Sequence, residues 1–194
     1  MLGIFLDTET NGLDPYRHVI IEVAFKIVDM QTGAILQSYQ SLVRQEKELW
    51  EKSDPESLGV NGFSFEELQN GKPSEDVEKE IKELFFKHKI KRGSSVFICQ
   101  NPSFDRVFFS QLINTNAQES LLWPYHWLDL ASMYWAISLT KGKADPKCLP
   151  WHTGINKDAI AKICGLAPET KPHRAANGVD HLLACYTALL GFPG

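Results

Sequence analysis

The stretch FLDTETNGL, residues 5–13, places two acidic side chains one position apart in an otherwise apolar run near the amino terminus. In a β-strand, residues i and i+2 point to the same face, so Asp7 and Glu9 should project together. An unpaired buried carboxylate is costly, and two neighbouring carboxylates repel each other. Two interpretations follow: either the strand ends at Leu6 and the acids are solvated, or a hard cation such as Mg²⁺ lies between them. For an isolated pair at this spacing, the solvated strand end is the commoner case.

The size and composition of the chain restrict the class of protein. A length of 194 residues is most simply one domain, and 43% apolar with 23% charged residues is typical of soluble globular proteins. The net charge of −4 argues against a broad basic surface for long nucleic acid, but not against an enzyme that acts on chain ends through metal ions.

Targeting signals and cysteines give the expected location. The four cysteines lack CxxC spacing, which favours reduced thiols over zinc or disulfides. The apolar amino-terminal run lacks the basic region and the length of a signal peptide, and no stretch approaches membrane-spanning length. We therefore expect a soluble, cytoplasmic protein with no membrane partner.

The hydrophobic pattern changes its period along the chain. Runs rich in β-branched residues predict three strands over residues 2–6, 19–29 and 34–43, arranged as an antiparallel meander. A capping box at Ser64 and helical spacing from Ser74 then predict helices. Strands over 95–99 and 125–128 each lead into a helix, Asn156 should cap another that ends at Gly165, and a last helix is expected over 179–190. This order indicates an α/β fold, a mixed five-stranded sheet flanked by helices.

Three short motifs carry a resemblance to a known family. DTETNGL, residues 7–13, resembles the first motif of the DEDD exonucleases, the DnaQ-like family, whose common form is DTETTGL. NPSFD, residues 101–105, resembles the second motif, and HRA, residues 173–175, resembles the opening of the third motif of the DEDDh subgroup. The motifs stand in family order over nearly the whole chain. The resemblance implies an RNase H-like fold and one exonuclease domain over residues 1–194, similar to the epsilon-type exonuclease of DNA polymerase III.

The resemblance also implies a mechanism and a set of site residues. Asp7, Glu9, Asp105 and a late aspartate would bind two divalent ions, Mg²⁺ or Mn²⁺, and His173 would be the general base. Two metal ions about 3.5–4 Å apart neutralise the phosphate, activate water and stabilise the leaving oxygen. The enzyme would hydrolyse DNA or RNA in the 3′→5′ direction and release nucleoside monophosphates. Contacts to the terminal nucleotide would come from Asn11, Gly12, Leu13 and Phe104.

The third motif departs from the family pattern. The family places its last aspartate five residues after the histidine, where this chain has Gly178. The first available acid is Asp180, seven residues after His173. We expect a loop over residues 176–178 to absorb the two extra residues, so that Asp180 becomes the fourth metal ligand. A capping acid at the start of the last helix is the alternative for Asp180, and His181 is the alternative base.

Two other classes of function stay open. Gly178 suggests a catalytically lapsed module that binds nucleic-acid ends without turnover. The acidic balance suggests a carboxylate–metal phosphoesterase acting on small nucleotides, which would show no dependence on polymer length. The sequence leaves open the choice between DNA and RNA, between single-stranded and recessed ends, the oligomeric state, and any replication or repair partner.

Overall fold

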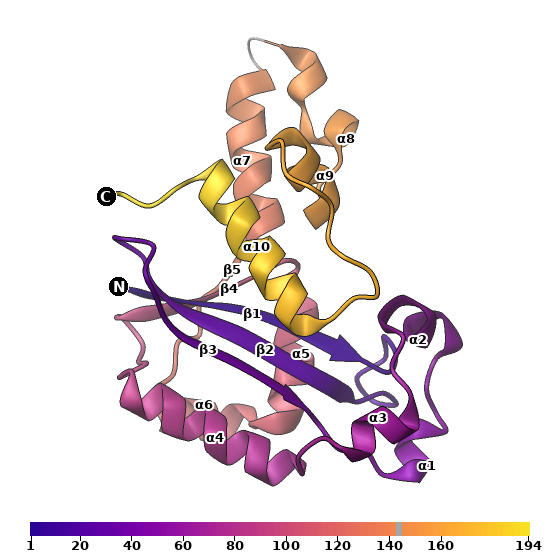
Figure 1. Ribbon diagram of the computed structural model, residues 1–194. Helices are drawn as coiled ribbons and strands as arrows, with labels where there is room; N and C mark the ends of the chain where they lie inside the picture. Colours follow the sequence, from indigo (N-terminus) through magenta and orange to yellow (C-terminus); the bar gives the residue numbers. More distant parts are fainter. Residues whose placement is uncertain (143–144) are drawn as a thin grey trace.

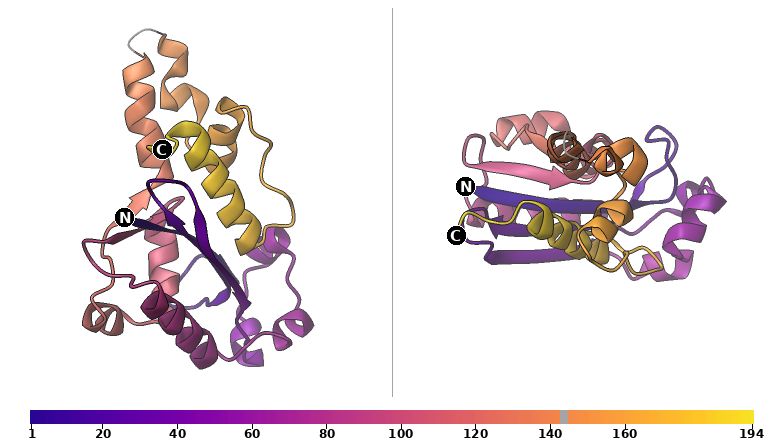
Figure 2. Two further views of the ribbon diagram at one scale, coloured as in Figure 1. Left: turned by 60° about the vertical axis from the view of Figure 1, so that its left-hand side comes forward. Right: turned by 90° about the horizontal axis from the view of Figure 1, so that it is seen from above.

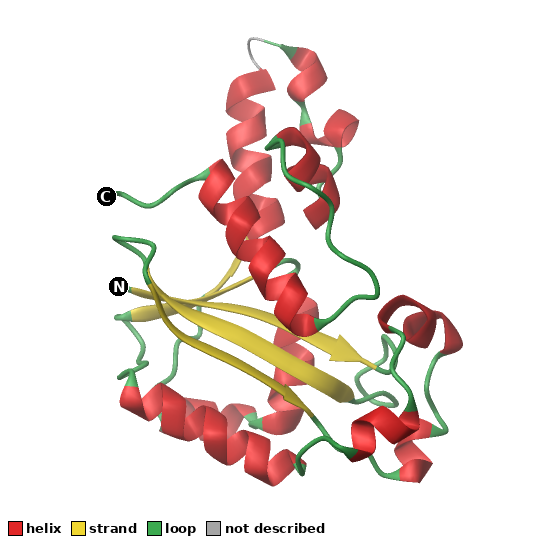
Figure 3. Ribbon diagram, viewed as in Figure 1, coloured by secondary structure: helices red, strands yellow, loops and turns green. Residues whose placement is uncertain are grey.

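A five-stranded sheet forms the centre of the computed structural model, which describes residues 1–142 and 145–194 (Figures 1 and 3). Its strands lie in the order β3-β2-β1-β4-β5. They span Leu2–Thr10 (β1), Ile20–Asp29 (β2), Ile35–Leu42 (β3), Ser95–Cys99 (β4) and Trp127–Asp129 (β5). The first three pair antiparallel, and β4 and β5 run parallel to β1. The predicted meander and mixed sheet are confirmed.

Strand β1 is longer than predicted. Its antiparallel pairing with β2 continues past Leu6, with Asp7 opposite Ala24 and Glu9 opposite Glu22, and the register shifts only between Glu9 and Thr10. The prediction that the strand ends at Leu6 is therefore wrong. Both acids stand on a paired strand, which fixes their separation and their common face.

Helices cover both faces of the sheet. Figures 1 and 2 show α4 and α6 on one side and α7 to α10 on the other. Alternation along β1 explains the two layers: Ile4 and Leu6 belong to the core on the α4 and α5 side, whereas Phe5 packs on the α10 side, with its ring 5.2 Å from that of Tyr186. The larger helices span Ser74–Lys87 (α4), Pro102–Leu112 (α5), Thr115–Ser120 (α6), Leu130–Gly142 (α7), Lys157–Ile163 (α9) and Ala175–Leu189 (α10).

Short helices complete the described chain, and two predicted caps are present. Ser64 Oγ accepts a hydrogen bond from Glu67 N, and Asn156 Oδ1 accepts one from Ala159 N at 2.8 Å. Gly165 follows α9 with a φ of +73°, as expected for a glycine after a helix end. No helix in the described ranges is both long and apolar enough to cross a membrane. The short helices are Lys47–Trp50 (α1), Pro55–Asn61 (α2), Phe65–Gln69 (α3), Pro150–Thr153 (α8) and the 3₁₀ helix Pro146–Cys148 (η1).

The last helix begins earlier than predicted. α10 starts at Ala175, whose backbone N–H donates to Glu22 Oε2 at 2.8 Å. Glu22 is fully buried on β2, so a carboxylate from the sheet satisfies the first turn of the helix. Ala175, Val179 and Leu182 are buried against the sheet. These tertiary contacts outweigh the low helix propensity of residues 177–178, so the predicted loop over 176–178 is wrong.

Candidate active site

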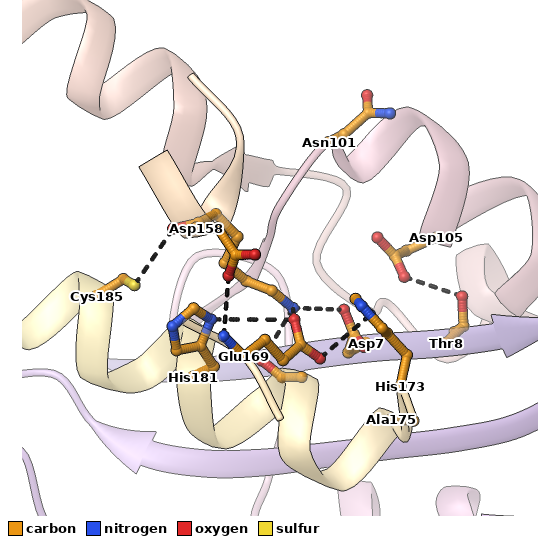
Figure 4. A network of polar contacts seen from close by, with 12 residues as sticks. Asp7, Thr8, Asn101, Asp105, Asp158, Glu169, His173, Ala175, His181 and Cys185 are labelled. Carbon is orange, nitrogen blue, oxygen red and sulfur yellow. Dashed lines mark hydrogen bonds and ion pairs between the residues drawn. The ribbon is translucent and has the colours of Figure 1, made fainter. Parts of the chain in front are cut away.

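A cleft of about 350 Å³ opens at the carboxyl end of β1. β1, the first turns of α5 and α9, and the loop before α10 contribute its walls (Figure 4). The structure brings five of the predicted site residues to this cleft and adds three charged residues that the sequence prediction missed. The predicted five are Asp7, Glu9, Phe104, Asp105 and His173, and the three additions are Lys157, Asp158 and Glu169.

The environment of Asp7 and Glu9 disfavours the ionised form of both carboxyl groups. Burial raises the pKa of Asp7 from 3.8 to about 6, although the ammonium of Lys157 partly opposes this. Burial, followed by the negative charges of Asp7 and Glu22, raises the pKa of Glu9 from 4.5 to about 8. In the cation-free protein Glu9 therefore keeps its proton near neutral pH, and a bound cation would favour its ionised form.

Asp105 approaches the cleft from α5. It lies in the first turn of that helix, is 3% exposed, and accepts a hydrogen bond from Thr8 Oγ1 at 2.9 Å. Burial and the nearby charge of Asp7 raise the pKa of Asp105 well above its usual range. The turn before α5 is held by the N–H of Asn101, which donates to Asp129 Oδ1 at 3.0 Å. β1 and α5 thus present three acids to one space.

Lys157 and Glu169 form the opposite wall. Lys157 Nζ lies 2.8 Å from Glu169 Oε2 and 3.5 Å from Asp7 Oδ1, and it donates to the carbonyl oxygen of Gly178 at 3.3 Å. Their side chains are only 12% and 3% exposed, respectively. One signal in the sequence could have pointed to Lys157. It is the first residue of α9, where the helix dipole disfavours a positive charge.

Two histidines contact Glu169 from different sides. His173 Nδ1 lies 3.6 Å from Glu169 Oε1, and His173 lines the cleft. His181 Nδ1 lies 3.9 Å from Glu169 Oε2, while its Nε2 is 2.9 Å from the carbonyl oxygen of Ala167. Figure 4 shows both rings beside Glu169. His181 does not line the cleft, so of the two it is His173 that stands where a general base would act.

Gly178 and Asp180 correct the prediction for the fourth acid. A Cβ at position 178 would overlap Asp7 Oδ2, because α10 packs directly on β1 there. Asp180 forms an ion pair with Lys26 of β2, is 58% exposed, and lines a separate cavity of about 380 Å³. Because α10 is continuous, two residues turn a side chain by about 200°. The prediction that Asp180 points toward Asp7 is wrong.

In the turn predicted to contact the nucleotide, Asn11 and Gly12 form hydrogen bonds within the protein. Asn11 is fully buried: its Nδ2 donates to Leu49 O and Ser53 Oγ, and its Oδ1 accepts from Val19 N at 2.7 Å. These bonds tie the polar groups of its side chain to neighbouring loops. The carbonyl of Gly12 accepts from Thr10 Oγ1, and the side chain of Leu13 is 71% exposed. Neither Asn11, Gly12 nor Leu13 lines the cleft.

The acids suit a divalent cation in chemistry, although they are not gathered around one point. Within residues 1–142 and 145–194, no group of three or more His, Cys, Asp or Glu side chains is arranged to hold a metal ion. Asp7, Glu9 and Asp105 nevertheless supply carboxyl oxygens, the kind of ligand that hard divalent ions prefer. Lys157 Nζ, 3.5 Å from Asp7 Oδ1, is the cation that lies beside Asp7 in the described chain.

Comparison with known proteins places these features in context. The exonuclease family (RNase T) matches residues 4–177. The PolC-type DNA polymerases III of Thermotoga petrophila and Thermotoga maritima are each 28% identical over 172 residues, which is 89% of this chain and 10% of theirs.

Solved structures share the fold. E. coli Exonuclease I in complex with an oligonucleotide superposes with a TM-score of 0.74 at 16% identity, covering 97% of this chain and 40% of that one. Exonuclease I from Methylocaldum szegediense gives 0.73 at 17% identity, with 97% and 40% covered. The expected RNase H-like architecture is confirmed, and the chain spans a tenth of the curated relatives and two fifths of the solved ones.

Proposed function

This chain belongs to the exonuclease family, and on that basis we propose that it is a divalent-metal-dependent exonuclease that shortens DNA or RNA from the 3′ end. It would release nucleoside monophosphates and act through one domain over residues 1–194. The observation that carries the proposal is the cleft at the end of β1, where buried Asp105 and half-buried Asp7 and Glu9 face a histidine. Metal-dependent phosphodiester hydrolysis needs acids that hold a divalent ion and a general base that activates water. Here β1 and α5 supply the acids, and the loop before α10 supplies the histidine.

The roles of the residues follow from their positions. Asp7, Glu9 and Asp105 would hold the ion, Mg²⁺ or Mn²⁺. When bound, a divalent ion polarises the phosphate and stabilises the leaving oxygen. His173 would take a proton from water; Glu169 lies on the Nδ1 side of its ring, which leaves Nε2 as the accepting nitrogen. Lys157 pairs with Glu169 in this buried setting, at 2.8 Å.

The substrate side of the proposal rests on the outer part of the cleft. Phe104 lines the cleft and packs on Phe108, with ring centroids 4.7 Å apart, so it could support a terminal base by stacking. Exposed Leu13 would contact the last nucleotide from the turn after β1. The net charge of −4 suits action on a chain end better than binding along a duplex.

Labelled oligonucleotides test this function. A DNA or RNA strand labelled at its 5′ end should shorten as a ladder with Mg²⁺ or Mn²⁺, and not with excess EDTA. A blocked 3′ end should slow the reaction. Cuts in circular single-stranded DNA would instead indicate an endonuclease, and equal rates on dinucleotides and long strands would indicate a small-substrate phosphoesterase.

One observation favours a second function, that of a lapsed end-binding module. Gly178 abuts Asp7 where a ligand would be needed for a second ion, and Lys157 already pairs with Asp7. That function predicts binding of 3′ ends by fluorescence anisotropy with no product at any metal concentration.

A further inference from the structure

One carboxylate of the cleft already has a cation. The three oxygens around Lys157 Nζ come from three separate elements: Asp7 of β1, Glu169 of the loop before α10, and the carbonyl of Gly178 in α10. An ammonium group has three donors and no acceptor, so each donor has an oxygen nearby. With 12% of the side chain exposed, the charge is held inside the protein rather than in solvent.

The α10 side of Asp7 offers no carboxylate for a metal ion. Position 178 is the part of α10 that lies against the Asp7 carboxylate, and any side chain there would overlap it. The next acid on the helix, Asp180, is turned toward Lys26. Two other acids line the cleft near Lys157: Glu169 is paired with Lys157 at 2.8 Å, and Asp158 Oδ1 accepts a hydrogen bond from Glu169 N at 2.9 Å.

Lys157 places one positive charge beside Asp7, and Gly178 places no carboxylate there. A fixed ammonium beside Asp7 can therefore balance the anionic cleft where an ion would otherwise be required.

We propose that the ammonium group of Lys157 takes the place of one of the two divalent ions, so that the cleft works with a single metal ion held by Asp7, Glu9 and Asp105. The inference rests on the proposed exonuclease function and specifies its metal requirement. It also assigns Glu169 a role: it anchors the ammonium and, through its other oxygen, reaches His173.

Metal counting on the unaltered protein is the direct test. Titration with Mn²⁺ should give one bound ion per chain. Binding is measured by calorimetry and by the loss of the EPR signal of free Mn²⁺. Two ions per chain would overturn the proposal and leave the exonuclease function intact. One ion per chain with no hydrolysis of any 3′ end would refute the proposed function and leave the ion count standing.

A pair of lysine variants on one helix adds a functional readout. Lys157→Met should lower kcat by about 100-fold at Mn²⁺ concentrations that saturate the native protein, the usual cost of losing one electrostatic group at a reacting phosphate. Its Mn²⁺ affinity should rise, because a positive neighbour of Asp7 is removed; structural damage would lower it. Lys162→Met, at an exposed position of α9, is the matched control and should stay within twofold.

A second substitution guards against misfolding. Lys157→Gln keeps a polar end that can donate to Glu169, and it should show the same loss of kcat with a normal thermal unfolding curve. A rate for either well-folded variant within threefold of the native protein would overturn the assignment.

Discussion

The two walls of the cleft differ in how their charge is balanced. On the wall made by β1 and α5, Glu9 and Asp105 have raised pKa values and no ion-pair partner in the described chain. On the wall made by α9 and the loop before α10, Glu169 is paired with Lys157 and approached by two histidines. The difference is what the proposed metal site predicts: Glu9 and Asp105 of the first wall have no cation paired with them among the described residues, and the second wall contains a cation, the ammonium of Lys157. The predictions below test that asymmetry.

The largest effect is expected from Asp7, which both walls share. Asp7→Asn should reduce metal-dependent hydrolysis below detection, because Asp7 is one of the three proposed metal ligands and also lies 3.5 Å from Lys157. The fold should persist, since removing one charge lessens repulsion with Glu9. Rates on a labelled strand and a far-ultraviolet circular dichroism spectrum measure the two results. Normal turnover would show that the acids of β1 are not the site.

The next largest effect separates the two histidines. His173→Ala should lower the rate by about 10²–10⁴, the usual contribution of a general base. His181→Ala should change it by less than about tenfold, because His181 acts only through Glu169, as supporting groups of a site do. Single-turnover kinetics with both variants make the comparison. A larger loss for His181 would exchange their roles.

The wall made by β1 and α5 should also make the stability of the metal-free protein depend on pH. The pKa of Glu9 rises on folding from 4.5 to about 8, so the folded state prefers the protonated form. The free energy of unfolding should therefore be highest below pH 4.5 as far as Glu9 is concerned, and should fall as pH rises toward 8, by on the order of a few kcal/mol.

Urea unfolding in EDTA at several pH values between 4.5 and 8 measures this dependence. Glu9→Gln should flatten it, and saturating Mn²⁺ should reduce it. A stability that rises steadily over this range in the native protein, with no change in the Glu9 variant, would show that Glu9 is not held protonated.

The smallest effect is expected at Asp180. Asp180→Asn breaks only an exposed ion pair with Lys26, so stability should change by less than about 1 kcal/mol and turnover by less than about twofold. Thermal unfolding and the ladder assay measure both. If this variant were inactive, α10 would have to lie differently on the sheet, and the contrast between the two walls would be lost.

The acids of the wall made by β1 and α5 were largely predictable because their geometry is local. Alternation along a strand fixes Asp7 and Glu9, and the first turn of a helix after a strand fixes Asp105. The caps at Ser64 and Asn156 were predictable for the same reason. The end of β1 was not predictable, because its last residues are held in the strand by pairing with β2 and not by a hydrophobic pattern of their own.

The wall made by α9 and the loop before α10 depends on contacts between distant parts of the chain. The start of α10 is fixed by Glu22, whose carboxylate is 153 positions away from Ala175. Low helix propensity at 177–178 predicted a loop, and this tertiary cap overrode it. Lys157 and Glu169 gave no motif; only the unusual lysine at the first position of α9 indicated a role beyond the helix.

The cap from Glu22 to α10 also has a consequence for the order in which the protein assembles. The β1–β3 meander joins neighbouring segments, whereas the closure by α10 links residues 153 positions apart, and long-range closures form late. Chains generally fold from the amino terminus as they leave the ribosome. The acids of β1 and β2 are therefore made first and spend part of synthesis without Lys157 and His173 beside them. We expect a nascent chain that stops before α10 to be inert toward nucleic-acid ends, with hydrolysis appearing only when the last helix docks.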